Sequence, residues 1–508
     1  MVETAINSRY NPSADEIADK RIFYVIRNIT FLAIVSLITI YYALQSAPDW
    51  TNLAWATFAI ALVTVFWQPH FGIYAIMFFS LVGDSRISYY LPFDKNLSSE
   101  ESIFFLNNSA AISPVEILFT LLVISWLLGL IIRRELYKIK YGGIFWSTAA
   151  FTVMIMIALA WGILRNGDLS IAQLEVRPIL YIAIMMVLTR NLITNPKQIN
   201  ILFWCIAFAL FIEGILAYQF VIANAIELNG ELTEHSASIH YNTIFVLGIA
   251  SWIVVKGSWV KRSFLFLLFP PILYSFLASD RRSAMLGLIL ALALTFLFLY
   301  QERKFLFLVL LPTLSIGIVI YLGLFWNNTS ALGKPAQTIK SVVAEDETNE
   351  KDQSSNFYRY LENLNSYYTV QQHPIMGVGF GNKFLQIAQM PDISFFIFWE
   401  YITHNSIFWI WIQSGVFGFM TMLYMVSVGV MNGARVAWTL PSSEIKVFAI
   451  VSVTYLFMHF LYAYVDISWT SQSMLYVGTV LGLISVLEDF QERLNQGESI
   501  EDLYLVKS

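Results

Sequence analysis

The sequence predicts an all-α membrane protein that crosses the bilayer about 14 times (12 to 14). Of its 508 residues, 57% are hydrophobic and only 13% are charged, and the mean hydropathy is +0.63. A soluble protein of this length needs a far more charged surface. Many apolar runs also reach the roughly 20 residues that span a bilayer as a helix. Together these observations exclude a soluble globular enzyme.

The predicted spans follow from the positions of the apolar runs. The fourteen segments are roughly 23–45, 52–67, 70–84, 113–132, 144–164, 178–189, 200–225, 241–255, 263–278, 283–300, 305–325, 405–432, 447–465 and 473–487. Only WQPHF separates the second segment from the third, so these two are either separate spans or one broken helix.

Basic residues near the span ends predict the orientation. One set of connections, which includes RRELYKIK, KGSWVKR and QERK, is rich in lysine and arginine. The alternate set includes ELNGELTEHSASIH and DISWTSQS, which have neither. Because cytoplasmic loops carry the excess of basic residues, the first set and both termini are expected in the cytoplasm. An even number of spans agrees with this topology of a multi-pass membrane protein.

The topology divides the chain into five expected parts. These are a cytoplasmic N-terminal tail (1–22), eleven spans (23–325), a large extracytoplasmic loop (326–404), three last spans (405–487) and an acidic cytoplasmic tail (488–508). Inside the loop, SVVAEDETNEKDQSSN is polar and expected at the surface. The following NFYRYLENLNSYYTVQQHP has helical spacing, and His373 is expected to end that helix because it precedes a proline.

Other classes of segment and partner are excluded by composition. The polar N-terminus of mixed charge is not a cleavable signal peptide. Cys205 is the only cysteine, so no intrachain disulfide forms. The net charge of -5 gives no indication of nucleic-acid binding.

Arginines stand where the orientation predicts few basic residues. The short outer connections carry Arg165, Arg177, Arg281 and Arg282, and none carries a lysine. The guanidinium group stays charged in a dehydrated site and matches phosphate and carboxylate oxygens. Because Arg177 and Arg282 both lie where outer connections re-enter the membrane, they are expected to converge on one anionic ligand, for which a lipid-linked phosphate or diphosphate is the candidate.

A structural role is the alternative for each arginine taken singly. Arg281 then pairs with Asp280, Arg177 pairs with Glu175, and Arg165 extends toward lipid phosphates.

His404 is the histidine best placed for chemistry. It comes at the end of the large loop in THNSIFWIWIQSGVFGF, where Asn405 and Ser406 can cap the start of the next span. A histidine that faces water there can act as a general base on a hydroxyl. In contrast, His459 lies mid-span and is expected to be packed. His235 and His240 are expected in a solvated loop rather than at a metal.

A glycine-rich element, HPIMGVGFGN, lies upstream of His404. Its glycines do not meet the G-x-G-x-x-G spacing of dinucleotide sites. Gly377 and Gly379 are expected instead to allow positive φ angles and to pack close to a ligand or a helix end.

As an ordered set, these features resemble the O-antigen ligase and O-antigen polymerase superfamily of bacterial membrane glycosyltransferases. The matching elements are RRSA at 281–284, Arg359 within NFYRYLENL, then HPIMGVGFG, and HNS followed by SGVFG within 404–418. The turn reads RRSA where the family has SRGA, so Arg282 aligns with the family's arginine. The resemblance covers about 277–425; the N-terminal half agrees only in hydropathy and in Arg177-Pro178.

The resemblance implies a metal-independent, inverting glycosyltransferase with no cofactor. It would move a glycan from an undecaprenyl-diphosphate carrier to an acceptor hydroxyl at the outer face of the inner membrane, in surface polysaccharide biosynthesis. In that assignment His404 is the base and Arg282 and Arg359 bind the diphosphate. The expected substrate-binding residues are Arg177, Arg281, Asp280, Gly377 and Gly379, and Asp280 is the rival base.

The expected partners follow from the same resemblance. They are the lipid-linked donor, a glycan, lipid or protein acceptor with a free hydroxyl, membrane lipids and, as a candidate, a chain-length regulator. The choice between ligase and polymerase stays open.

Two other functions compete with this assignment. A flippase or transporter of lipid-linked glycans would also place arginines in the membrane, but the halves show no repeat and no matching broken spans. An acid-catalysed glycosyltransferase would need paired outer carboxylates; Asp84 has no clear partner.

Overall fold

The computed structural model describes residues 50–82, 93, 95–99, 105, 111–223, 237–255, 264–279, 281–328, 332–344, 350–393 and 396–505. The chain divides into two units, residues 1–60 and 61–508, and every helix from residue 70 onward belongs to the second. The described residues of this second unit form helices and connections without a strand. The predicted all-α class is therefore confirmed.

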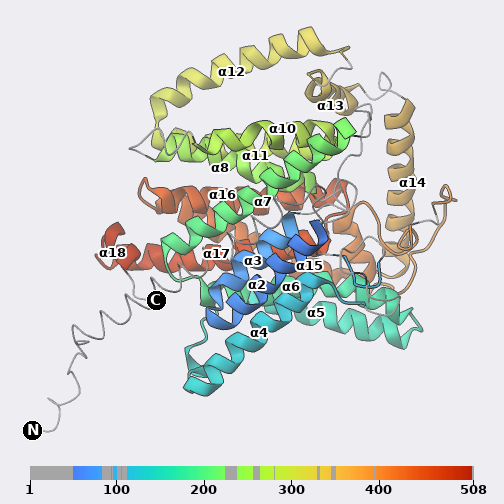
Figure 1. Ribbon diagram of the computed structural model, residues 1–508. Helices are drawn as coiled ribbons and strands as arrows, with labels where there is room; N and C mark the ends of the chain where they lie inside the picture. Colours follow the sequence, from blue (N-terminus) through green and yellow to red (C-terminus); the bar gives the residue numbers. More distant parts are fainter. Residues whose placement is uncertain are drawn as a thin grey trace, which may run out of the picture. The chain divides into compact units, whose positions relative to one another are not determined.

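Helices follow one another along the whole described chain (Figure 1). The α-helices are α2 (Trp50–Trp67), α3 (His70–Leu81), α4 (Pro114–Arg133), α5 (Phe145–Leu164), α6 (Leu169–Leu192), α7 (Pro196–Ala223), α8 (Ala237–Val254), α10 (Phe269–Ala278), α11 (Arg282–Glu302), α12 (Lys304–Phe325), α13 (Lys334–Val343), α14 (Glu350–Gln372), α15 (Ser406–Thr439), α16 (Glu444–Val465), α17 (Ser471–Asn495) and α18 (Ile500–Leu505). The 3-10 helices are η1 (Leu136–Lys138) and η2 (Phe264–Leu268).

The helices that can cross a membrane make this a multi-pass membrane protein. In the described part of the chain, nine are long and apolar enough: α4, α5, α6, α7, α11, α12, α15, α16 and α17. Helices α2 and α3 are separate, with a break at Gln68 and Pro69, and α10 has only 10 residues. The total of fourteen spans stays a prediction.

Helices α16 and α17 form the centre of the bundle. In their apolar stretches 83% and 94% of the residues are buried, whereas α12 has no buried residue. Helix α17 packs closely on α6 because it presents Gly478 and Gly482 to it: a Cβ at these positions would lie 2.6 and 2.7 Å from backbone oxygens of α6. Small residues four apart allow this approach.

Helix α15 is broken near its start to receive the glycine-rich element. Gly415 has φ +66, and a Cβ there would lie 1.9 Å from the carbonyl oxygen of Ile375. The break frees the carbonyls of Ile412 and Gln413, which accept hydrogen bonds from the backbone N–H groups of Val378 (2.8 Å) and Gly379 (3.1 Å). The element is thereby fixed to the helix that follows His404.

The described residues of the predicted large loop include two α-helices, α13 and α14. Helix α14 ends at Gln372, directly before His373 and Pro374, as predicted. In Figure 1 it stands at one end of the bundle and runs steeply across the direction of α16 and α17.

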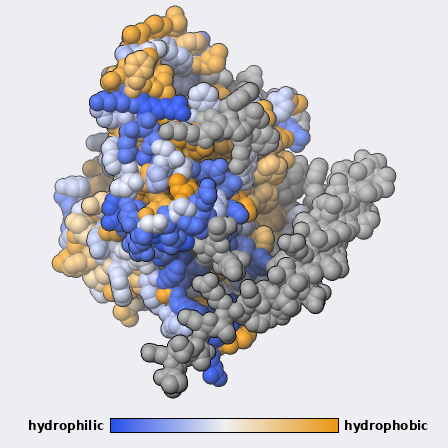
Figure 2. All heavy atoms as spheres, turned by 90° about the vertical axis from the view of Figure 1, so that its left-hand side faces the viewer, coloured by the Kyte–Doolittle hydropathy of each residue, from blue (hydrophilic) through white to orange (hydrophobic). Residues whose placement is uncertain are grey.

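Ion pairs gather at the opposite end of the bundle. They join Arg190 to Asp489 (2.6 Å), Arg435 to Glu488 (2.9 Å) and Lys446 to Glu302 (2.5 Å). Figure 2 shows hydrophilic residues in the centre of this end. Helix α17 continues to Asn495, so the first residues of the predicted acidic tail are helical and its first two carboxylates, Glu488 and Asp489, are paired.

Candidate active site

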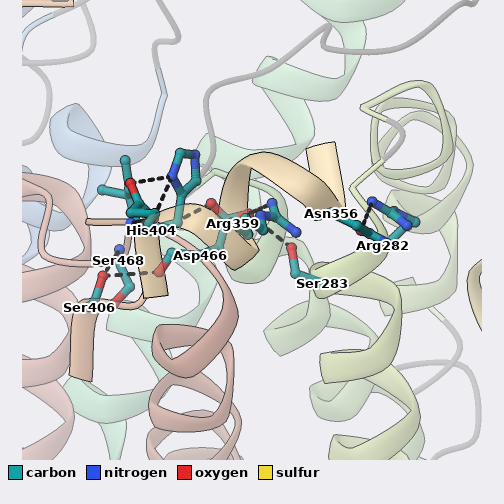
Figure 3. Close-up of polar contacts among 10 residues, drawn as sticks. Arg282, Ser283, Asn356, Arg359, His404, Ser406, Asp466 and Ser468 are labelled. Atoms are coloured by element: carbon teal, nitrogen blue, oxygen red, sulfur yellow. Dashed lines mark hydrogen bonds and ion pairs between the residues drawn. The ribbon is translucent and has the colours of Figure 1, made fainter. Parts of the chain in front are cut away.

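Three side chains on one face of α14 each contact a different helix end. Asn356, Arg359 and Glu362 follow one another at intervals of three residues, so they share a face over a rise of about 9 Å. Their partners, in the same order, are Arg282 in α11, Asp466 after α16, and His404 before α15. In Figure 3 the labels of the row follow one another from left to right: His404, Asp466, Arg359, Asn356 and Arg282. Three segments far apart in the sequence therefore meet along α14.

Glu362 holds both the main chain and the ring of His404. Its Oε2 accepts a hydrogen bond from the backbone N–H of His404 at 2.7 Å, and both carboxylate oxygens lie 3.1 Å from Nδ1. The Glu362 side chain is 3% exposed and that of His404 is 22% exposed. The edge of the Tyr358 ring lies against the imidazole, with ring centroids 5.7 Å apart. The imidazole is thus fixed on one side and partly open on another.

Tyr358 is itself affected by this carboxylate. Burial and the nearby charge of Glu362 raise the pKa of Tyr358 well above its usual value. The phenol therefore stays neutral and is a hydrogen-bond donor near the imidazole.

The start of α15 explains the position of His404. Asn405 caps the helix, as predicted, by accepting a hydrogen bond from the N–H of Phe408 at 3.1 Å. Ser406 does not cap: its hydroxyl donates to the carbonyl of Asp466 and accepts from the N–H of Ser468, both at 3.0 Å. These bonds tie the α16–α17 connection to α15 beside His404.

Asp466 is the most buried charged residue of the row, with a side chain that is 1% exposed. Its Oδ2 accepts from the Ser283 hydroxyl at 3.0 Å, and its Oδ1 accepts from the N–H of Ile467 at 2.9 Å. Nη2 of Arg359 lies 3.9 Å from Oδ2. Within the described residues Nε of Arg359 has no hydrogen-bond partner. The arginine is held loosely and keeps donors for another anion.

The turn that opens α11 supplies the second arginine. Arg282 is the first residue of α11, is half-buried, and donates from Nη2 to Oδ1 of Asn356 at 3.0 Å. Arg281 is buried, at 9% exposure, within electrostatic reach of Tyr462. The predicted residue Asp280 lies outside the described residues.

Most residues of this site lie in a region that matches a known sequence family. Residues 264–423 match the family model described as O-antigen ligase. The chain carries an O-antigen ligase domain. The predicted resemblance to the O-antigen ligase superfamily is confirmed over these residues. No curated protein matches the chain.

The O-antigen ligase domain contains most of the row. Its matched residues run from η2 into α15 and include Arg282, Arg359 and His404. Asp466 and Arg177 lie outside the match. The domain supports an enzyme of the ligase or polymerase type in general terms, with a lipid-linked glycan and an acceptor as the general partners.

The glycine-rich element of the O-antigen ligase domain packs against protein. Gly377 and Gly379 have φ values of +68 and +84, as predicted from their residue type. A Cβ on Gly379 would lie 2.4 Å from the Cα of Gly162 in α5. Both N–H groups are already used: that of Gly377 by the carbonyl of His373, and that of Gly379 by α15. Neither backbone N–H group is therefore left to donate a hydrogen bond to a substrate, as the predicted substrate contact would require.

Arg177 has partners other than those predicted. Its Nε lies 2.9 Å from Oε1 of Glu116, its Nη2 donates to Asn96 at 3.1 Å, and its Nη1 donates to the carbonyl of Ala111. The suggested pairing with Glu175 is wrong, because Oε2 of Glu175 accepts from the N–H of Gly381 at 2.7 Å. No described contact joins Arg177 to the row, so the expected convergence with Arg282 is not seen.

Three other histidines, His459, His240 and His235, are packed or lie outside the described part. His459 is 1% exposed, as expected for a packed residue. His240 lies within α8, not in a loop, and is stacked on Tyr455. His235 lies outside the described residues. Across the described ranges no three His, Cys, Asp or Glu side chains gather as a metal site requires.

Two carboxylates of the row were not predicted from the sequence. Glu362 stands one helical turn after Arg359, a spacing that places both on one face of a helix. Asp466 is the single charged residue of DISWTSQS, an outer connection without basic residues. The spacing of Glu362 and the lone charge of Asp466 could both be seen in the sequence. However, a carboxylate in either segment is equally expected on a surface exposed to solvent.

Proposed function

We propose that this protein transfers a glycan from an undecaprenyl-diphosphate carrier to an acceptor hydroxyl. The observation that carries the proposal is the row along α14, because it combines two arginines with a partly open histidine inside the O-antigen ligase domain. Such a set can neutralise a leaving diphosphate and accept a proton within one site.

Arg359 and Arg282 are the proposed diphosphate ligands. Each guanidinium group offers several fixed donors that match phosphate oxygens. The loose 3.9 Å pair of Arg359 with Asp466 supports this role, since it orients the arginine without using all its donors. Stabilising the charge that develops on a leaving group is commonly the largest catalytic contribution.

His404 is the proposed general base. The acceptor oxygen attacks the anomeric carbon as the bond from that carbon to the diphosphate oxygen breaks. The diphosphate leaves with the bonding electron pair, and the hydroxyl proton passes to His404. Attack opposite the leaving group inverts the configuration, and this chemistry uses no metal.

The other predicted residues receive different proposed roles. Arg281 assists from its buried position directly before Arg282. Gly377 and Gly379 act at a distance by fixing the start of α15, and Arg177 acts by fixing α6 to α4.

We further propose that the row faces the extracytoplasmic side of the inner membrane. The basic connections predicted to be cytoplasmic end near the ion pairs at the opposite end of the bundle. The acceptor is a second glycan, a lipid or a protein hydroxyl. Surface polysaccharide is the proposed product.

The test compares His404→Ala and Arg282→Ala with wild type in the native host at matched expression. Carrier lipids and surface polysaccharide are extracted, and the glycan chain length is measured on both. The expected result is carrier-linked glycan that accumulates while the surface product is lost. Single repeat units on the carrier indicate a polymerase, and long chains indicate a ligase.

Two control variants match these changes. His373→Ala removes a histidine outside the row, and Arg303→Ala removes an arginine at the other end of α11. Both should keep the surface product. Wild-type product from His404→Ala and Arg282→Ala would refute the proposed site.

A further inference from the structure

The carboxylate of Glu362 makes two contacts that differ in kind. The bond from the His404 N–H to Oε2, at 2.7 Å, fixes where the chain enters α15. The contacts of Nδ1 with both oxygens, at 3.1 Å, act on the ring alone. A purely structural carboxylate would need only the first contact.

The ring contact determines which nitrogen carries the proton. A carboxylate accepts hydrogen bonds and does not donate them. Nδ1 must therefore carry the proton, which leaves the lone pair of the neutral imidazole on Nε2. The hydrogen bond made by one ring nitrogen thus sets the role of the other.

The same carboxylate favours the charged ring that forms during proton transfer. Once Nε2 accepts a proton, the imidazolium lies beside a buried anion 3.1 Å away. At 3% side-chain exposure, Glu362 is little screened by water. The stabilisation is therefore larger for the charged ring than for the neutral ring.

We infer that Glu362 is the positioning residue of His404: it fixes the tautomer with the lone pair on Nε2 and stabilises the imidazolium that forms there. This inference rests on the proposed function, in which His404 is the base. In this inference Glu362 acts on the reaction only through His404.

The first experiment is a mutant cycle of wild type, Glu362→Gln, His404→Ala and the double variant. Each purified protein is assayed with carrier-linked glycan extracted from the host. Glutamine keeps the size of the side chain and removes its charge. We expect Glu362→Gln to lower kcat roughly 10- to 100-fold, with KM for the donor within about twofold and an unchanged melting temperature. The double variant should be no slower than His404→Ala, because residues that act as a unit are not additive.

The cycle has clear contrary outcomes. Wild-type kcat in Glu362→Gln overturns the inference. So does a double variant slower than His404→Ala by the full factor of Glu362→Gln, since Glu362 would then act independently of the imidazole.

A second measurement does not depend on activity. ¹⁵N NMR of histidine-labelled protein, with His404 assigned from the spectrum of His404→Ala, reports which ring nitrogen carries the proton. We expect the Nδ1-protonated tautomer in wild type and a mixture in Glu362→Gln. The Nε2-protonated form in wild type would overturn the inference. If the expected tautomers appear but His404→Ala stays fully active, the proposed function fails while the geometric part of the inference stands.

Discussion

The guanidinium group of Arg359 lies 3.9 Å from a carboxylate that two other groups already satisfy. Asp466 accepts hydrogen bonds from Ser283 and from the N–H of Ile467, and its longer contact with Arg359 comes in addition to these two bonds. The carboxylate thus stays buried without depending on the arginine. The partner orients the arginine but leaves some of its N–H donors unused, which suits a residue that must bind an incoming anion.

Asp466→Asn should impair transfer more than stability. The amide oxygen can still accept from the N–H of Ile467, and the amide NH2 can donate to the Ser283 hydroxyl, but the charge that orients Arg359 is lost. We expect a roughly 10-fold lower kcat/KM for the carrier-linked donor, equivalent to about 1.4 kcal/mol, from initial rates at several donor concentrations. Ser283→Ala is the control: it should cost about 1 kcal/mol of stability and leave kcat/KM nearly unchanged. Equal effects of the two variants on kcat/KM would contradict this role of the charge.

Arg177→Gln should act on stability, because Glu116 loses its ionic partner. The Glu116 side chain is only 10% exposed, and removing one partner of a buried ion pair costs about 3–5 kcal/mol. Since Arg177 is 30% exposed, we expect the lower end of that range in thermal unfolding of the detergent-solubilised protein.

The double variant Arg177→Gln, Glu116→Gln separates the two explanations of Arg177. If the ion pair is structural, removing both charges should restore most of the stability and of the transfer activity. Restored stability with no activity would return Arg177 to the substrate-binding role expected from the sequence.

Gly379→Ala should prevent correct packing of the glycine-rich element. Its φ of +84 would strain an alanine by about 1–3 kcal/mol, and the new Cβ would meet the Gly162 backbone at a similar further cost. We expect a lower melting temperature and weaker expression. Gly317→Ala in α12, where a Cβ meets nothing within 4 Å, should match wild type. A stable Gly379→Ala protein that lacks only activity would point to a direct substrate contact.

Protonation of His373 should make the protein less stable in mild acid. Burial, and secondarily the charge of Arg165, lower the pKa of His373 below its usual value of 6.5. The unfolded chain therefore takes up this proton first as the pH falls. The contribution to stability is complete above pH 6.5 and is lost as the pH falls below it toward the lowered value. The melting temperature should decline less between pH 7.5 and 5.5 in His373→Gln than in wild type, and equal declines would exclude His373 as the cause.

The sequence predicted those parts of the site that depend on local signals. Helical spacing and the His373-Pro374 pair indicated the end of α14, and the change from polar to apolar residues placed His404 at the start of α15. Pairings between distant segments were not predictable in this way. Arg177 was expected beside Arg282 because both re-enter the membrane, yet its partner is Glu116, 61 positions earlier in the chain. Which carboxylate an arginine meets depends on how α4 and α6 pack, and spacing along one segment contains no information on that.

The row along α14 also constrains how the site can move. Asn356, Arg359 and Glu362 are joined by a rigid helix, so a movement of α14 as a whole would change their contacts with α11, the α16–α17 connection and α15 together. If α14 lifts away from the bundle, Arg282, Asp466 and His404 lose their partners together. Assembly and dismantling of the site would be a single all-or-none event, and one residue inserted between Asn356 and Glu362 would turn the following part of the helix by about 100° and separate the base from the arginines.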